Sequence, residues 1–203
     1  MDRNEMTLVL LKPDAVKRGI VGDIIGRFER ALIHIVGMRM IMATPVQISR
    51  HFANTTESIT ALGEKMLRSY ASMDIDPQTL HRKTDARSIG LDLQCSITEY
   101  FQSGPMIKMV LCGTDAMARV REMVGSTLPY EAVPGTIRGD FSLGKAIENI
   151  PGKACVNMVH ASENTIEACR EIASWFDRDE IMLFSYSRSS LPHMHDAMPS
   201  RLR

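Results

Sequence analysis

The chain has 203 residues, enough for one domain with a well-filled core and with room for insertions or a tail. Hydrophobic residues make up 44% of it and charged residues 24%, as in an ordinary globular protein. The formal net charge is zero, so no global field attracts nucleic acid or an anionic membrane. An anionic substrate must therefore be held by a local cluster of cations.

The cysteines predict a protein of a reducing compartment, and the hydropathy pattern predicts no membrane-spanning segment. Cys95, Cys112, Cys155 and Cys169 form no CxxC pair, and no signal peptide stands at the N-terminus. We therefore expect reduced, partly buried thiols in a cytoplasmic protein. The spacing of Cys155, His160 and Cys169 is wrong for a zinc site. No apolar run approaches the ~20 residues that a membrane span needs.

The first part of the chain predicts two strands with a helix between them. Residues 7–11 (TLVLL) are a short apolar run that ends before Pro13, which is typical of a buried strand. Apolar residues at helical spacing in 24–32 indicate a helix. Residues 33–43 mix β-branched residues with methionine and predict a second strand, and 49–52 should begin another helix.

The middle of the chain is less regular. Residues 53–97 are polar, with helical fragments in 59–70 and a break at Pro77. A third strand is predicted at 106–111 (MIKMVL) and a short helix at 116–124.

Residues 125–153 are rich in loop signals, and a fourth apolar run at 154–159 predicts a strand that ends at His160. Ser162 can cap the helix that follows it. The predicted buried face of that helix consists of Ile166, Cys169, Ile172 and Phe176. Residues 187–203 show no periodicity and predict a disordered tail. Strand–helix–strand occurring twice predicts an α+β fold, a ferredoxin-like βαββαβ sandwich with an antiparallel sheet.

The candidate catalytic residues are isolated in the sequence. No GxxxxGK[ST] loop, GxGxxG or HExxH motif is present, so phosphate would have to be bound by side chains. Arg138 follows a Pro-Gly turn, and its fork of donors suits a phosphate, although the residues taken alone favour a structural turn with Arg138 paired to Asp140. Lys12 and Arg121 each read, taken alone, as solvated surface cations. His160 is well placed as a nucleophile, a base or a ligand, although a lone histidine is more often structural, and Glu171 could orient its ring.

Three blocks change this interpretation when they are taken together: KPDAVKRG (12–19), GSTLPYEAVPGTIRGDF (125–141) and NMVHASE (157–163). They resemble the signature blocks of nucleoside diphosphate kinases, in the same order and with matching internal spacing. The resemblance extends from Thr7 to about Tyr186. It implies one kinase domain over 1–186, with insertions at about 53–97 and 142–156, and a ferredoxin-like fold.

The resemblance also implies a role for each matched residue. His160 matches the histidine that is phosphorylated during turnover. The residues that match those gripping the nucleotide phosphates are Lys12, Arg121, Thr127 and Arg138. Asn157 matches the asparagine that contacts the sugar, and Ser162 and Glu171 match the pair that holds and polarises the histidine ring. Each cation is expected to contribute ~2–4 kcal/mol of transition-state stabilisation.

The same resemblance implies the reaction and the partners. The γ-phosphate of a nucleoside triphosphate passes to a nucleoside diphosphate by a ping-pong mechanism through phosphohistidine. Mg²⁺ is expected to be bound through the nucleotide phosphates and not directly by the protein. The implied assembly is a homo-oligomer, a tetramer or a hexamer of dimers, in the cytoplasm, with no membrane and no specific nucleic-acid partner.

The sequence departs from the family pattern around the substrate. Phe52 of the pair His51-Phe52 stands where the family usually has tyrosine, so a hydroxyl near the phosphates is missing and slower turnover is expected. The first insertion replaces the short helical hairpin that supplies the base-stacking aromatic, for which Tyr70 is one candidate. Both insertions resemble those of some archaeal-type members.

The sequence also bears on three other classes of function. A family member without turnover would serve as a nucleotide-sensing or interaction module, although all the required residue types are present. A metal-dependent hydrolase centred on His160 lacks a ligand set. Single-stranded nucleic-acid binding would need exposed aromatics on strands and a basic groove, which aromatic-poor strands and zero net charge disfavour.

Overall fold

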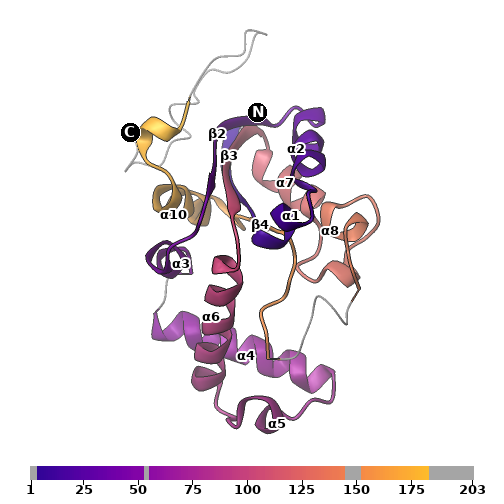
Figure 1. Cartoon of the computed structure of the whole chain (residues 1–203), viewed down its shortest axis with the longest axis vertical. Coiled ribbons are helices and arrows are strands. Elements are labelled where there is room, and N and C mark those ends of the chain that lie inside the picture. The colour runs from indigo at the N-terminus through magenta and orange to yellow at the C-terminus, as the bar shows by residue number, and fades with distance from the viewer. Residues whose placement is uncertain (1–3, 53–54, 145–151, 183–203) are drawn as a thin grey trace.

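The structure is a computed structural model that describes residues 4–52, 55–144 and 152–182. Four antiparallel strands form one sheet in the order β2-β3-β1-β4 (Figure 1). The strands are β1 (Asn4–Leu11), β2 (His34–Ile41), β3 (Met106–Thr114) and β4 (Val159–Ala161). The order and the antiparallel pairing confirm the predicted ferredoxin-like α+β fold.

The helices of the described residues cover both faces of the sheet. They are α1 (Pro13–Lys17), α2 (Val21–Arg30), α3 (Pro45–His51), α4 (Thr56–Ser72), α5 (Pro77–His81), α6 (Ala86–Gln102), α7 (Ala116–Val124), α8 (Ile137–Asp140) and α10 (Thr165–Trp175), with 3₁₀ turns at Pro129–Glu131 and Arg178–Glu180. Figure 1 shows α2 and α7 on one side of the sheet and α3 and α10 on the other. Among these helices none is both long and apolar enough to cross a bilayer.

Strand β1 lies at the centre of two hydrophobic cores. Leu8 and Leu10 pack into the core on the α10 side together with Trp175. Val9 and Phe28 belong to the core on the α2 side. Because both faces are covered, the strand reads as a continuous apolar run and not as an alternating one. Because β1 is buried on both faces and pairs with β4, its end is held beside that strand. Lys12, the residue after β1, is thereby placed near His160 of β4.

Helices α4 and α6 cross at two glycines and project from one end of the sheet (Figure 1). A Cβ atom on Gly63 would lie 1.7 Å from the carbonyl oxygen of Ala86, and one on Gly90 would lie 2.0 Å from that of Ile59. The two backbones therefore touch, and no larger residue fits at either position. The predicted helical fragment in 59–70 is confirmed, and so is the break before α5, which Asp76 caps.

Two predicted boundaries are wrong. Helix α3 begins at Pro45, earlier than expected, because Thr44 caps it and accepts a hydrogen bond from the backbone N–H of Gln47. The predicted strand at 154–159 is reduced to a strand that starts at Val159. Met158 has a φ of 60°, in the left-handed region, which interrupts a regular strand immediately before β4.

The predictions for the last helix need two corrections. Asn164, and not Ser162, caps α10, because its side chain accepts a hydrogen bond from the backbone N–H of Glu167. Ile166 is 83% exposed, so the buried face is rotated toward Ala168, Glu171 and Ile172. The predicted tail at 187–203 lies outside the described residues.

Candidate active site

Lys12 and Asn157 form one wall of the site. The backbone N–H of Lys12 donates to the carbonyl oxygen of Met158 (2.7 Å), which ties the end of β1 to the approach of β4. The Lys12 ammonium donates to Asn157 Oδ1 (2.6 Å), and Asn157 Nδ2 donates to the carbonyl oxygen of Thr127 (2.8 Å). Burial, aided by the charge of Arg138, lowers the pKa of Lys12 to about 8.

Arg138 joins β4 to the loop that follows α7. Its guanidinium donates to four backbone carbonyl oxygens, those of Asn157 (3.2 Å), Gly125 (2.9 Å), Ser126 (3.0 Å) and Val159 (2.6 Å). The alternative pairing with Asp140 is wrong, because Asp140 accepts a hydrogen bond from Arg27 (2.6 Å). Burial lowers the pKa of Arg138 to about 10, so it remains a cation at neutral pH. Arg138 therefore both anchors the loop and supplies charge.

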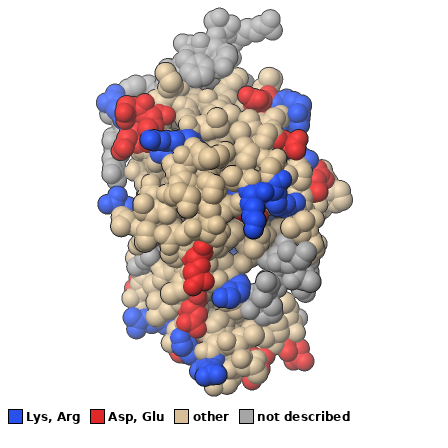
Figure 2. Space-filling model, viewed as in Figure 1, with Lys and Arg blue, Asp and Glu red and all other residues tan. Residues whose placement is uncertain are grey.

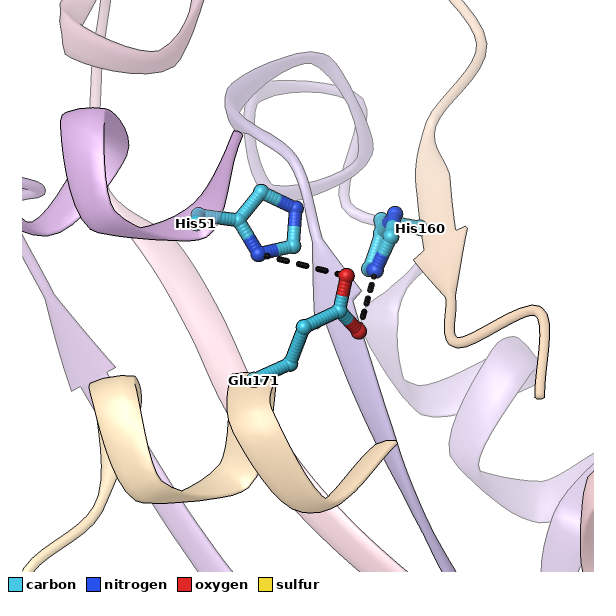
Figure 3. A group of neighbouring side chains, drawn as sticks. All are labelled: His51, His160 and Glu171. Atoms are coloured by element: carbon cyan, nitrogen blue, oxygen red, sulfur yellow. Dashed lines mark hydrogen bonds and ion pairs between the residues drawn. The ribbon is translucent and has the colours of Figure 1, made fainter. Parts of the chain in front are cut away.

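His160 lies in β4 and is bound by Glu171, which reaches across from α10 (Figure 3). His160 Nε2 is 3.0 Å from Glu171 Oε2, which also accepts a hydrogen bond from the Ser162 hydroxyl at 2.6 Å. Because an ionised carboxylate only accepts, the imidazole proton belongs on Nε2, and Nδ1 keeps its lone pair. Burial and the charges of Lys12 and Arg138 lower the pKa of His160 to about 3, so the ring is neutral at pH 7.

His51 is a member of the site that the sequence did not predict as functional. Its ring packs edge-on against that of His160 with centroids 4.4 Å apart, and its Nδ1 lies 3.6 Å from Glu171 Oε1 (Figure 3). The indole of Trp175 donates to the same Nδ1 (3.1 Å). An indole can only donate, so His51 Nδ1 carries no proton and the contact with Glu171 is not an ion pair.

Burial and the neighbouring His160 lower the pKa of His51 well below its usual range, which agrees with a neutral ring. The ligand atoms of His51, His160 and Glu171 lie within 4.8 Å of one another, close enough to suit a metal ion. The lone pair of His51 Nδ1 is already used by Trp175, however, so His51 packs against His160 and Glu171, and the hydrogen bonds to the Glu171 carboxylate come from His160 and Ser162. In the sequence, only the position of His51 beside Phe52 indicated that His51 belongs to the site.

A cavity of about 550 Å³ opens in front of His160. It is lined by every residue that the sequence assigned to the nucleotide phosphates or sugar: Lys12, Arg121, Thr127, Arg138 and Asn157. Phe52 also lines this cavity, as does Lys65 of α4, a cation that the sequence did not predict. The arrangement places a neutral imidazole among cations, as nucleophilic attack on an anionic phosphate requires.

A second cavity of about 400 Å³ continues from the first and is more apolar. The two cavities share part of their lining, which includes Lys12, Phe52, Lys65, Thr127 and Asn157. The far walls of the second cavity come from α4, from α6 and from the segment before β4: Leu62, Met66, Ile97, Tyr100, Ala154 and Cys155. Tyr70 lines neither cavity and is 1% exposed, so its candidacy as the base-stacking aromatic is wrong.

The two buried histidines predict a loss of stability in mild acid. Both have native pKa values below the unfolded value of 6.5, so their contribution is complete above pH 6.5 and is lost as the pH falls. Glu171 opposes them, because burial raises the pKa of its carboxyl above the unfolded value, so on acidification the native state takes up that proton at a higher pH than the unfolded state does. Between pH 6.5 and 5 the free energy of unfolding should therefore fall as the pH falls, by no more than about 3 kcal/mol per pH unit, the limit for two protonating groups.

Urea unfolding at several pH values measures this slope. His160→Asn removes one of the two groups and should reduce the slope by about 1.4 kcal/mol per pH unit. A flat stability profile between pH 6.5 and 5 in the unmodified protein would contradict the neutral, buried state of both rings.

Comparison with known proteins agrees with this geometry. The sequence profile described as nucleoside diphosphate kinase matches residues 5–69 and 91–181. A nucleoside diphosphate kinase of Pyrobaculum aerophilum is 42% identical over 179 residues, which cover 88% of this chain and 98% of the relative. One from Pyrococcus abyssi is 36% identical over 188 residues, covering 93% and 92% of the two chains. The unmatched stretch, 70–90, contains α5 and lies inside the first predicted insertion.

Solved structures show the same relationship. The crystal structure of an NDP kinase from Pyrobaculum aerophilum superposes with a TM-score of 0.84 at 40% identity, over 89% of this chain and all of the other. A kinase from Borrelia burgdorferi with bound vanadate and ADP, described as a transition-state mimic, gives a TM-score of 0.69 at 28% identity, over 91% and 94% of the chains. With its fold, its site and its sequence in agreement, the chain belongs to the nucleoside diphosphate kinase family of phosphotransferases.

Proposed function

We propose that this chain transfers the γ-phosphate of a nucleoside triphosphate to a nucleoside diphosphate, with Nδ1 of His160 as the carrier atom. The observation that carries the proposal is the state of His160. Its Nε2 faces Glu171, its ring is neutral, and it borders a cavity lined by Lys12, Arg121 and Arg138. A carrier must hold the phosphoryl group at high transfer potential, and a histidine N–P bond does so whereas a serine ester is too stable.

In the first half-reaction the lone pair of Nδ1 forms a bond with the γ-phosphorus while the bond from that phosphorus to the β-phosphate oxygen breaks. The nucleoside diphosphate leaves with the electron pair. The ring gains positive character, and the Nε2 proton is then held more strongly by Glu171, whose orientation Ser162 fixes. In the second half-reaction a terminal oxygen of another nucleoside diphosphate attacks the same phosphorus, and Nδ1 regains its lone pair.

The cations supply most of the stabilisation. The transition state is loose, with negative charge on the equatorial oxygens, so positioned positive charges lower its free energy. Lys12 and Arg138 are held by the hydrogen bonds described above, while Arg121, exposed on the last turn of α7, lines the same cavity. Thr127 lies between the two cavities and is proposed to contact the same phosphates.

The nucleoside is proposed to occupy the second cavity. Its largely apolar walls suit a flat base, and Asn157 lines both cavities, as a sugar contact requires. Kinases of this family are known with such ligands, since the structure from Halobacterium salinarum holds CDP (28% identity, TM-score 0.62, covering 91% of this chain and 95% of that one). Tyr70 does not line this cavity, but Phe52, Tyr100 and Phe101 do, so a base bound there is proposed to contact aromatic as well as aliphatic side chains.

Mg²⁺ is proposed to enter with the nucleotide. Magnesium prefers oxygen ligands, and the residues around His160 offer cations and an amide instead of converging carboxylates. The carboxylates that line the first cavity are Glu163, which precedes α10, and Glu167, which lies in its first turn. The donor set thus fits a metal held by the substrate phosphates and water, where it would neutralise charge on the transferring group.

A cytoplasmic homo-oligomer, a tetramer or a hexamer of dimers, completes the proposal. The four cysteines are free thiols, which suits a reducing compartment. Because this chain is similar to the archaeal kinases over nearly their whole length, we expect it to assemble as the family does.

Labelling with γ-³²P-ATP and Mg²⁺ tests this function. The protein should become labelled, the label should be lost in acid and kept in base, and a nucleoside diphosphate should discharge it as labelled triphosphate. A protein that binds nucleotide but takes up no label would be a nucleotide-sensing module instead of a kinase.

Phe52→Tyr tests the departure from the family pattern. Phe52 borders both cavities, and a hydroxyl added to its ring would offer a further hydrogen bond to the phosphates. One such bond is worth about 1 kcal/mol, so kcat/KM should rise about fivefold. The control is Leu62→Met, which changes only the second cavity and should leave the rate of phosphorylation at saturating ATP unchanged. Phe28→Tyr would not serve as a control, because Phe28 is fully buried.

A further inference from the structure

The segment at 152–158 lacks regular secondary structure, yet side chains from helices hold its backbone. Three of these contacts come from α4 and α6. The backbone N–H donors and their acceptors are Gly152 to Tyr70 Oη (3.1 Å), Ala154 to Ser96 Oγ (2.8 Å) and Asn157 to Tyr100 Oη (3.3 Å). Met158 in turn donates to Asp14 Oδ2 (3.1 Å). Helix side chains thus replace the strand ladder that this segment lacks.

Tyr70 is itself held by a directional chain of hydrogen bonds. Asp92 only accepts, and Lys83 (2.7 Å) and His81 lower the pKa of its carboxyl, so His81 Nδ1 donates to it (3.1 Å). His81 Nε2 then accepts from the Tyr70 hydroxyl (2.8 Å), and the Tyr70 oxygen accepts from the N–H of Gly152. Each bond polarises the next, which makes Tyr70 Oη a better acceptor than an isolated phenol.

This chain of residues has no part in phosphoryl transfer. Tyr70 and His81 lie in the stretch 70–90 that the family profile leaves unmatched, and Tyr70 lines neither cavity. Both side chains are nevertheless buried, with Tyr70 at 1% and the His81 side chain at 5% exposure. Burying a polar group is costly unless it is hydrogen-bonded. Here the buried Tyr70 hydroxyl is bonded to His81 and to the N–H of Gly152, directly before the residues that line the second cavity.

We propose that Tyr70 and Ser96 are positioning residues that hold the segment 152–157 as a wall of the nucleoside pocket. Lys153, Ala154 and Cys155 of that segment line the second cavity, and the segment ends at Asn157. The first insertion, which contains Tyr70 and Ser96, thereby sets the affinity for the nucleoside part of the substrate. The phosphoryl-transfer step at His160 is unaffected. The inference rests on the proposed placement of the nucleoside in the second cavity.

Tyr70→Phe keeps the ring and removes the hydroxyl, and with it both the hydrogen bond from Gly152 and the one to His81. We expect the Kd of ADP, measured by calorimetry, to rise about three- to tenfold, as for the loss of one hydrogen bond. Inorganic pyrophosphate, which has no nucleoside, should bind with unchanged affinity. The rate of His160 phosphorylation at saturating ATP should also be unchanged, so KM rises without a fall in kcat.

Ser96→Ala tests the same wall from α6 and should show the same pattern, which keeps the test open if Tyr70→Phe folds poorly. Thr60→Val is the matched control, because the Thr60 hydroxyl donates only to the Thr56 carbonyl oxygen of its own helix (2.8 Å). Unchanged ADP affinity in both variants, or equal losses for ADP and pyrophosphate, would overturn the proposal. Absence of label on the unmodified protein with normal ADP binding would instead contradict the proposed kinase activity alone.

Discussion

His160→Asn is expected to abolish phosphoenzyme formation and to lower phosphoryl-transfer activity by about five to six orders of magnitude, as for other lost nucleophiles. Asparagine keeps a polar side chain at this point of β4 but offers no nucleophilic nitrogen. The surrounding cations remain, so ADP should still bind with an affinity close to that of the unmodified protein. A coupled assay of nucleoside triphosphate formation measures the first effect, and calorimetry measures the second.

His34→Asn is the matched control, since His34 lies in β2, at the opposite edge of the sheet from β4. It should retain full activity and label. Activity in the His160 variant within tenfold of the unmodified protein would rule out His160 as the carrier.

Lys12→Met should lower kcat/KM by about 10²- to 10³-fold, the usual effect of removing one preorganised donor. Lys12 is held by Asn157 and borders both cavities, so its charge cannot be replaced by bulk solvent. Lys17→Met on the exposed side of α1 removes the same charge from the surface and is the control. Kinetics of nucleoside diphosphate phosphorylation under subsaturating substrate measure the difference.

The pKa of Lys12 adds a pH dependence to this prediction. Its pKa is lowered to about 8, so the free enzyme carries the charge below pH 8 and loses it as the pH rises further. The kcat/KM of the unmodified protein should therefore fall above about pH 8, whereas that of Lys12→Met should not. Equal pH profiles for the two proteins would show that another group titrates.

Much of the fold could be predicted because buried strands and covered helices leave periodic apolar patterns. The runs at 7–11 and 106–111 correspond to the two central strands, which are apolar on both faces. The strand expected at 154–159 failed for a physical reason. Its apolar residues pack as expected, but side chains of α4 and α6 hold its backbone in place of a neighbouring strand, a contact that no local pattern reveals.

The site was predictable where residues act directly on the substrate and hidden where they act through a neighbour. Lys12, Arg138 and His160 lie in recognisable blocks, and the structure brings them to one cavity. His51 acts by packing against His160 and Glu171, and its place beside Phe52 did not reveal that role. Lys65 depends on the path of an inserted helix and has no sequence signature.

The most direct measurement is the position of the phosphorus on the histidine ring. NMR of the phosphoenzyme, made with ¹⁵N-labelled histidine, reports which ring nitrogen is bonded to phosphorus and which carries a proton. The arrangement of His160 and Glu171 predicts phosphorus on Nδ1 and the proton on Nε2. Phosphorus on Nε2, or an acid-stable ester on a serine, would contradict it.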